Sequence, residues 1–318
     1  MTPLRIAVVS GGRSSEAEVS RNSAAHVIGA LQARGHRCVE LDGDEELWDA
    51  LRGGAYDVAF LALHGRYGED GTVQGVCELL GVPYTGSDVL ASALCFNKAM
   101  AKRVLAAGGL ATPAWIVVAR TAPPDSATEQ MRGAAATLGL PLVVKPNRSG
   151  STIGLTIVAD EDGLKSAYAD AAWHDDVLCE AFVTGMEVTI GILGHNPPKA
   201  LPTLEIISHR PLYDYAAKYT AGQSEHIIPA RLPDDQRLAA EHSAVRAHQL
   251  LGCRGFSRVD IIVDAAGVPW VLEVNTIPGL TPISLLPDAA RAAGIDFGDM
   301  CEGLIDDALA RHREKAPR

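Results

Sequence analysis

The chain has 318 residues, of which 47% are hydrophobic and 21% are charged, and this balance excludes an intrinsically disordered protein and suits two or three domains. The formal net charge of -11 leaves no basic surface that could neutralise many phosphates, so we expect no nucleic-acid partner. The six cysteines have no CxxC spacing, and the sequence contains neither a membrane-length apolar run nor a signal-peptide pattern. It therefore predicts a cytoplasmic protein with no membrane partner.

Residues 1–96 have the pattern of a small parallel α/β domain. The stretch "LRIAVVSGG" reads as a strand that enters a glycine turn, a helical period follows, and "YDVAFLALHG" reads as a second buried strand. Ligands of such sheets bind beyond the carboxyl ends of the strands, where "SGGRSSEAEVS" and "HGRYGEDG" lie. These two loops are therefore candidate substrate loops.

Three residues in these loops are informative. Ser15 is expected to cap the following helix together with Glu18, which would leave Glu16 in the first turn, free to meet a substrate ammonium. His64 ends an apolar strand, so it is either a satisfied core histidine or a ligand-binding residue. Asp70 is read as a helix N-cap rather than as a catalytic acid.

Residues 97–179 change to a pattern of a helix, the strand "WIVV", a second helix, the strand "PLVVKP" and the loop "NRSGSTIGL". Lys145 stands at the end of a strand, immediately before a loop that contains Gly150 and Gly154. Glycines let backbone amides approach an anion closely, and a lysine supplies the charge, so the loop is a candidate phosphate site. The alternative is a plain surface hairpin loop, and Lys98 taken alone reads as a solvated lysine.

Residues 180–318 contain the strands "VLCEAF", "MEVTIGIL" and "PTLEII", a helix from about residue 233 to 251, and two further β-rich runs. Between them, residues 208–225 show no clear periodicity, which is more typical of a functional lid than of an idle loop. Lys218 and Tyr219 lie in this segment and are candidates to reach a phosphate and a substrate. An aromatic loop packed on the surface is the alternative.

The last two β-rich runs, "GFSRVDIIVD" and "PWVLEVN", are separated by a turn-like "AAGV" and are expected to form a hairpin. Pairing near the turn places Asp260 opposite Glu273, with Arg258 and Asn275 as the next pair on the same face. Two carboxylates that face each other require a cation between them.

Side chains alternate between the two faces of a strand, so Glu273 and Asn275 should share one face while Leu272 and Val274 point the other way. Carboxylate and amide oxygens are hard ligands that suit Mg²⁺, which also retains phosphate oxygens and water. The alternative is an ordinary polar sheet face.

Taken in order, the motifs "GGRSSEAEVS", "HGRYGEDG", "VKPNRSGSTIG", "YDYAAKY" and "EVNTIPG" resemble those of the D-alanine:D-alanine ligase family, over most of the chain. The resemblance implies a mixed α/β and α+β architecture of the ATP-grasp type. In it, an N-terminal α/β domain (1–96) precedes a central subdomain (97–179) and a C-terminal subdomain (180–318), which enclose the ATP site between them. It also implies ATP-dependent joining of two D-alanines through an acyl phosphate, for peptidoglycan precursors.

The resemblance assigns most of the nucleotide site. Two Mg²⁺ ions, replaceable by Mn²⁺, would be held by Asp260, Glu273 and Asn275. The phosphates of ATP would be met by Lys98, Lys145, Lys218 and the loop around Ser151. The adenosine would be met by Glu180 at the amino group, the backbone of Ala181 and Val183 at the ring edge, and Glu187 at the ribose.

The resemblance also assigns the amino-acid site. The first D-alanine would be held by Glu16 at its ammonium and His64 near its carboxylate. The tetrahedral oxyanion would be stabilised by Arg258 and the amide of Gly279. The carboxylate of the second D-alanine would be bound around Ser284 and Leu285. The closed site would be tied together by hydrogen bonds among Glu16, Ser151 and Tyr219.

Several points go beyond this assignment. Tyr219 resembles the lid tyrosine of dipeptide-forming relatives, so D-alanine is predicted as the second substrate, and a homodimer is expected because the family is commonly dimeric. Ser149 stands where an acidic residue is expected, which bears on lid contacts rather than on chemistry. No side chain is assigned as the base for the second amine. The alternatives are another ATP-grasp carboxylate–amine ligase, or a nucleotide-binding regulator that would not need the complete metal set.

Overall fold

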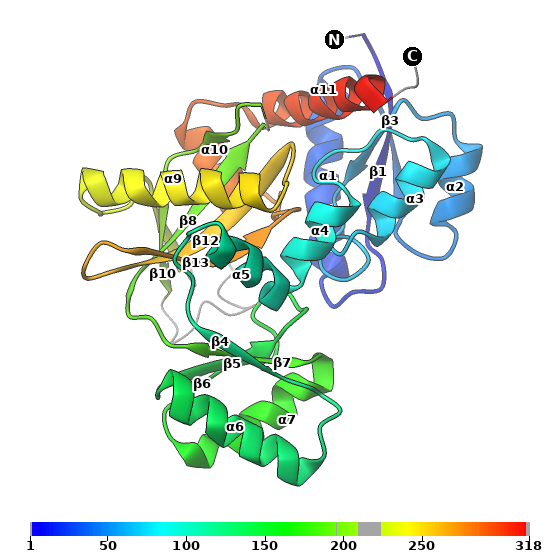
Figure 1. Ribbon diagram of the computed structural model, residues 1–318. Coiled ribbons are helices and arrows are strands. Elements are labelled where there is room, and N and C mark those ends of the chain that lie inside the picture. The colour runs from blue at the N-terminus through cyan, green and yellow to red at the C-terminus, as the bar shows by residue number, and fades with distance from the viewer. Residues whose placement is uncertain (1, 195, 209–223, 316–318) are drawn as a thin grey trace.

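The computed structural model of the protein describes residues 2–194, 196–208 and 224–315, and it contains three β-sheets with helices packed against them (Figure 1). The segment that holds Lys218 and Tyr219 lies outside the described residues. No helix in the described part of the chain is long and apolar enough to span a bilayer.

The first sheet is parallel, with strand order β2-β1-β3. Its strands are β1 (Arg5–Ser10), β2 (Arg37–Asp42) and β3 (Val58–Leu61), and its helices are α1 (Ala17–Ala33), α2 (Leu47–Gly53) and α3 (Thr72–Leu80). The expected β-α-β pattern is present, but β2 was not predicted. This strand is only half-buried, so it lacks the continuous apolar run of β1 and β3.

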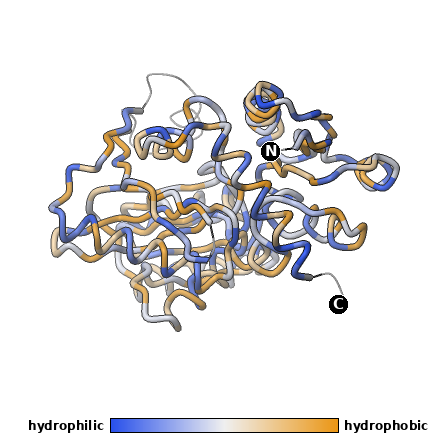
Figure 2. The backbone as a smooth tube through the Cα atoms, turned by 90° about the horizontal axis from the view of Figure 1, so that it is seen from above, coloured by the Kyte–Doolittle hydropathy of each residue, from blue (hydrophilic) through white to orange (hydrophobic). Residues whose placement is uncertain are grey.

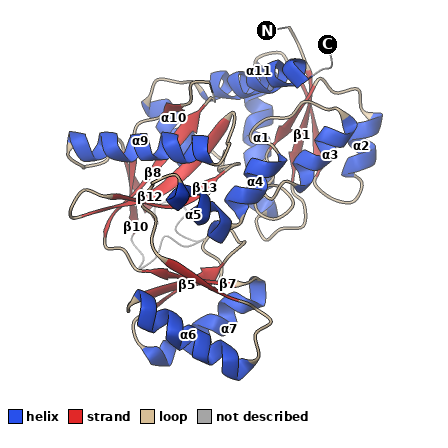
Figure 3. Ribbon diagram, viewed as in Figure 1, coloured by secondary structure: helices blue, strands red, loops and turns tan. Residues whose placement is uncertain are grey.

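The central sheet is antiparallel, with strand order β4-β7-β5-β6, and helices cover one of its faces (Figure 3). Its elements are β4 (Trp115–Val118), α6 (Pro124–Leu138), β5 (Leu142–Pro146), β6 (Thr156–Val158), η1 (Glu161–Gly163), α7 (Leu164–His174) and β7 (Val177–Ala181). Apolar side chains of α6 and α7 pack onto β5 and β7. This packing fixes the two strand ends that carry Lys145 and Glu180.

The large sheet is antiparallel, with strand order β11-β10-β8-β12-β13, and β9 pairs with β8. Its strands are β8 (Gly185–Leu193), β9 (Lys199–Ala200), β10 (Leu204–Ser208), β11 (Ser224–Ile227), β12 (Phe256–Asp264) and β13 (Pro269–Asn275). One face is covered by helices α4 (Val89–Phe96), α5 (Lys98–Ala107) and α9 (Asp234–Leu250). The opposite face of β12 and β13 is left to carry polar side chains.

The predicted hairpin register is confirmed where it matters for the site. Asp260 pairs with Glu273 and Arg258 with Asn275, but a bulge next to Asp260 leaves Leu272 without a partner. At the turn, Val263 rather than Asp264 pairs with Pro269. The expectation that Leu272 points away from Glu273 is therefore wrong, because both side chains line the same cavity.

The end of the chain returns to the first sheet. After α10 (Leu285–Ala292), helix α11 (Phe297–Lys315) packs against α1 and β3, and its buried Cys301 and Ile305 join the core of that sheet. The last turns of α11 are hydrophilic, as the tube near the C-terminus shows in Figure 2. The division of the chain at residues 96 and 179 remains a prediction.

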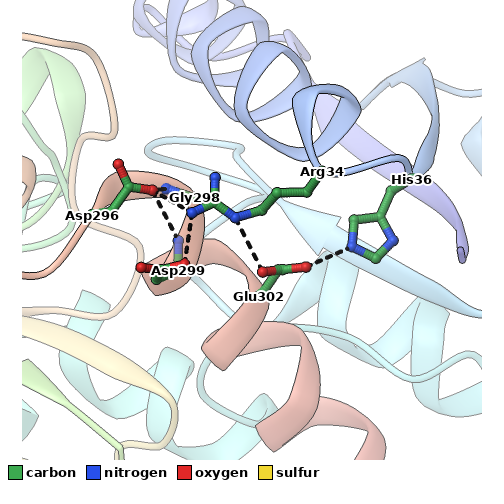
Figure 4. Close-up of polar contacts among 6 residues, drawn as sticks. All are labelled: Arg34, His36, Asp296, Gly298, Asp299 and Glu302. Atoms are coloured by element: carbon green, nitrogen blue, oxygen red, sulfur yellow. Dashed lines mark hydrogen bonds and ion pairs between the residues drawn. The ribbon is translucent and has the colours of Figure 1, made fainter. Parts of the chain in front are cut away.

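An ion-pair cluster fixes this packing (Figure 4). The guanidinium of Arg34, just after α1, contacts Asp296, Asp299 and Glu302 around the start of α11. The hydrogen bonds that Arg34 donates to Asp299 and Asp296 raise the pKa of Arg34 further above its ordinary value. The beginning and the end of the chain are thus joined by charge as well as by apolar packing.

Candidate active site

The polar face of the β12–β13 hairpin is centred on Asp260. Arg258 donates two hydrogen bonds to its carboxylate, from Nε to Oδ1 at 2.9 Å and from Nη2 to Oδ2 at 2.8 Å. Asn275 Nδ2 donates to Oδ2 at 3.1 Å and Thr189 Oγ1 donates to Oδ1 at 2.6 Å. The carboxylate is therefore held in one orientation by four donors.

Glu273 stands opposite Asp260 and faces a lysine. Lys98 Nζ lies 3.2 Å from Glu273 Oε2 and donates to the carbonyl of Ser149 at 2.7 Å. The Lys98 side chain is only 11% exposed, so it is not the solvated lysine that the local sequence suggests. It connects the hairpin to the candidate phosphate loop.

The donor set fits a hard divalent cation. Asp260 and Glu273 face each other across the hairpin with the Asn275 amide beside them, and their negative charge is met here by Arg258 and Lys98. Among the residues that the structure describes, no group of three or more His, Cys, Asp and Glu side chains is arranged to hold a metal. A metal at this hairpin would therefore take further oxygens from its ligand or from water, as Mg²⁺ commonly does.

The candidate phosphate loop, residues 147–155, lies against the first substrate loop. Ser151 Oγ donates a hydrogen bond to the carboxylate of Glu16. An added Cβ on Gly150 would lie 2.5 Å from Glu16 Oε2, and one on Gly65 would lie 2.6 Å from the same atom. The Glu16 carboxylate thus occupies a space that exists only because two neighbouring residues are glycines.

Glu16 is positioned in a different way from that expected. The N-cap of α1 is Glu16 itself and makes no side-chain cap, so the predicted capping by Ser15 is wrong. Ser14 Oγ instead accepts from the amide of Glu16 at 3.2 Å and donates to the carbonyl of His64 at 2.8 Å. A contact between the two substrate loops therefore replaces a local helix cap.

His64 satisfies both interpretations of the sequence. Its Nε2 contacts Ser23 Oγ at 2.9 Å and its Nδ1 contacts the carbonyl of Ile277 at 3.0 Å, so it is a buried and partnered histidine. It also lines the same cavity as Glu16 and Gly279. Burial lowers the pKa of His64, which favours the neutral ring.

Glu69 is a site residue that sequence reasoning missed. Its Oε2 accepts a hydrogen bond from the amide of Gly65 at 2.7 Å. Burial, and then the charge of Glu16, raise the pKa of Glu69 to about 8. Its position in the candidate substrate loop "HGRYGEDG", four residues after Gly65, is the feature of the sequence that could have indicated it.

Asp70, next to it, is not an N-cap. The capping position of α3 is Gly71, and the Asp70 carboxylate accepts hydrogen bonds from the amides of Tyr67 and Thr72. Asp70 therefore fixes the shape of the substrate loop rather than the start of the helix.

A buried cluster of three charged side chains is centred on Glu180. Glu180, at the end of β7, lies between two lysines: its Oε2 is 2.5 Å from Lys145 Nζ and its Oε1 is 2.7 Å from Lys102 Nζ. Lys102 was not predicted, because one lysine in an amphipathic helix has the appearance of a solvated residue. Ala181 ends β7, Val183 follows in the connection to β8, and Glu187 lies on β8.

Two cavities meet at this site. The larger, of about 110 Å³, is lined among others by Lys98, Lys145, Glu187, Asp260, Glu273 and Leu285. The smaller, of about 40 Å³, is lined among others by Glu16, His64, Glu69, Asn275 and Gly279. Arg258, Ser151 and Glu273 line both, so the two cavities adjoin.

The remaining predicted residue, Ser284, adjoins Gly279. Its hydroxyl accepts from the amide of Thr281 at 3.1 Å, and a Cβ on Gly279 would lie 2.8 Å from Ser284 Oγ. Ser284 immediately precedes α10, which begins at Leu285. The roles given to these residues by resemblance stay predictions.

The chain matches two family models, described as the N-terminus and the C-terminus of D-ala D-ala ligase, over residues 44–87 and 104–306. It is 48% identical to the D-alanine–D-alanine ligase of Moorella thermoacetica over 307 residues, which cover 96% of this chain and 99% of that protein.

Solved structures agree with this result. The D-alanine–D-alanine ligase of Bacillus anthracis complexed with ATP is 35% identical, has a TM-score of 0.84, and covers 99% of this chain and 100% of its own. The VanG D-Ala:D-Ser ligase of Enterococcus faecalis is 30% identical, with a TM-score of 0.82 and coverage of 96% and 100%. The fold is that of the ATP-grasp ligases, as the sequence motifs predict, and the chain belongs to the D-alanine–D-alanine ligase family.

Proposed function

We propose that this chain joins two D-alanine molecules into D-alanyl-D-alanine, with conversion of ATP to ADP and phosphate, for the synthesis of peptidoglycan precursors. The observation that carries the proposal is the junction of the two cavities. The small cavity carries Glu16 and the large one carries Lys98 and Lys145, and they meet at Arg258 and Glu273. An amino acid and a polyphosphate can therefore be bound side by side.

The first step is phosphoryl transfer. The carboxylate of the first D-alanine attacks the γ-phosphorus of ATP, an O–P bond forms, and the bond to ADP breaks. Lys98 and Lys145 offset the charge of the phosphates, and the loop around Ser151 supplies backbone amides. Glu16 receives the ammonium of this D-alanine, while the neutral His64 lies near its carboxylate.

The second step forms the peptide bond. The free amine of the second D-alanine attacks the acyl carbon, a C–N bond forms, and the C–O bond to phosphate breaks. Arg258 and the amide of Gly279 stabilise the oxyanion of the tetrahedral intermediate. The second carboxylate is bound around Ser284 and Leu285.

The metal part of the proposal rests on the donor set. Asp260, Glu273 and Asn275 would hold two Mg²⁺ ions, or Mn²⁺ in their place. When bound, such ions would offset the negative charge on the phosphate oxygens of ATP while the phosphoryl group is transferred. The adenosine would be met by Glu180, by the backbone of Ala181 and Val183, and by Glu187, which lines the larger cavity.

Substrate choice and assembly are also proposals. VanG is a D-Ala:D-Ser ligase, so this fold accommodates more than one second substrate, and we assign D-alanine here. We further propose a homodimer that acts in the cytoplasm, and the six cysteines, all free, support a reducing compartment.

The test is phosphate release from Mg-ATP by the purified protein with D-alanine, L-alanine or neither, with mass spectrometry of the product. Release with D-alanine alone, and a product with the mass of D-alanyl-D-alanine, is expected. Release that requires a different amino acid would point to another carboxylate–amine ligase. ATP binding without release under any condition would point to a regulator.

A further inference from the structure

Lys102 is a buried cation behind the nucleotide cavity. Its side chain, on α5, is completely buried. Its Nζ donates to Thr112 Oγ1 at 2.7 Å and to the carbonyl of Pro113 at 3.1 Å, and lies 2.7 Å from Glu180 Oε1. Two hydrogen bonds and one ion pair therefore meet the buried ammonium.

Glu180 transmits this charge to the cavity. Its other oxygen lies 2.5 Å from Lys145 Nζ, and Lys145 lines the larger cavity whereas Lys102 does not. Burial opposes ionisation of Glu180, but the charges of Lys145 and Lys102 outweigh it and keep the pKa of the carboxyl below its ordinary value. The three side chains therefore form one row, Lys102–Glu180–Lys145, from the interior to the cavity.

Charge counting gives this row a consequence. Two ammonium groups and one carboxylate leave a net charge of +1, whereas Lys145 and Glu180 alone would be neutral. Lys102 does not line the cavity, so its own charge acts on an anion there from further away than that of Lys145, and its main effect passes through the carboxylate that the two lysines share. We propose that Lys102 is a positioning residue that neutralises Glu180 from behind and so leaves the charge of Lys145 available to the nucleotide phosphates. This inference rests on the proposed binding of ATP in that cavity.

The experiment is a double-mutant cycle with K102M, E180Q and K102M/E180Q. The affinity for Mg-ATP is measured by calorimetry without amino acid, and the KM values for ATP and D-alanine are measured in turnover. We expect K102M to weaken ATP binding by about tenfold or more, with the KM for D-alanine within about twofold. In the E180Q background, K102M should weaken ATP binding by less than about threefold, because no carboxylate remains at position 180 to be neutralised.

Two controls separate this role from a structural one. K165M removes an exposed lysine from α7 and should leave ATP affinity unchanged, which excludes an effect of overall charge. T112V removes a partner of Lys102 but no charge, so it should lower the melting temperature and retain ATP affinity. A purely structural Lys102 predicts that T112V and K102M weaken ATP binding alike.

Two results would overturn the inference: a folded K102M with unchanged ATP affinity, or an equal loss from K102M in the wild-type and E180Q backgrounds. If K102M does not fold, E180Q is compared with K102M/E180Q, because neither variant leaves a carboxylate buried without its cation. A difference in ATP affinity above about tenfold between these two variants contradicts the proposal. A wild-type protein that binds ATP but forms no dipeptide would refute the proposed reaction and leave this inference standing.

Discussion

The two cavities of the site differ in how their charges are met. In the larger one, lysines stand beside carboxylates, as Lys98 does with Glu273 and Lys145 with Glu180, and Glu180 is shared with a second lysine, Lys102. In the smaller one, the charge of Glu16 helps to raise the pKa of Glu69, and two glycines and the Ser151 hydroxyl lie against the Glu16 carboxylate, with Arg258 as the cation that lines the cavity. The first arrangement suits a polyanion held by placed lysines, and the second suits an ammonium.

The strongest test of the larger cavity is E273Q. The change retains shape but removes the charge that faces Asp260, so we expect turnover to fall by about 10²–10³-fold, while the melting temperature stays near that of the wild type. Phosphate release is measured across a Mg²⁺ titration. Full activity at ordinary Mg²⁺ concentrations would contradict the assignment of Glu273 as a metal ligand.

The smaller cavity is tested by G150A. A Cβ at this position would lie 2.5 Å from Glu16 Oε2, so either the carboxylate or the loop must move. We expect the KM for D-alanine to rise by about tenfold or more, because a displacement of one ångström is costly for a positioned group. The matched control is G133A in α6, where a Cβ meets nothing within 4 Å, and it should leave both KM values unchanged.

The like-charge character of the smaller cavity is tested by E69Q. The pKa of Glu69 is about 8 in the folded protein against an ordinary 4.5, so folding favours the protonated form, and this contribution to stability is lost as pH rises from 4.5 to 8. The melting temperature of E69Q should therefore be higher than that of the wild type at pH 8 but not at pH 4.5. The expected increase is roughly 2–4 °C for each kcal/mol of free energy of unfolding that is gained. Parallel melting curves of the two proteins between these pH values would contradict the assignment.

The smallest effect is expected from G133A itself. Alanine is a better helix former than glycine, so the free energy of unfolding should increase by up to about 1 kcal/mol. Chemical denaturation measures this gain. A loss of stability would mean that the helix packs more tightly there than the empty space around Gly133 indicates.

The sequence could predict the hairpin because a short turn joins two β-rich runs, but the pairing of Asp260 with Glu273 also depends on a bulge, since Val263 rather than Asp264 pairs with Pro269. It could not predict the bulge at Leu272, because the bulge lets Val271 and Val274, three residues apart, both reach the core. That choice depends on packing beneath the sheet.

The errors around Glu16 and Lys102 have a common cause. Ser14 rather than Ser15 engages the backbone because its hydroxyl contacts His64, which lies 50 residues away. Lys102 is buried because Glu180, distant in sequence, lies beside it. Local sequence patterns report local preferences, whereas the side chains of both residues are positioned by a partner from another element.

The return of the last helix to the first sheet also has a consequence for biosynthesis. Arg34 is synthesised 262 residues before its partner Asp296. During translation, most of the chain must therefore be made before α11 can cover the first sheet. Until then the apolar surface that Cys301 and Ile305 will bury stays open to water or to a chaperone. The domain that is made first is therefore among the last to be completed.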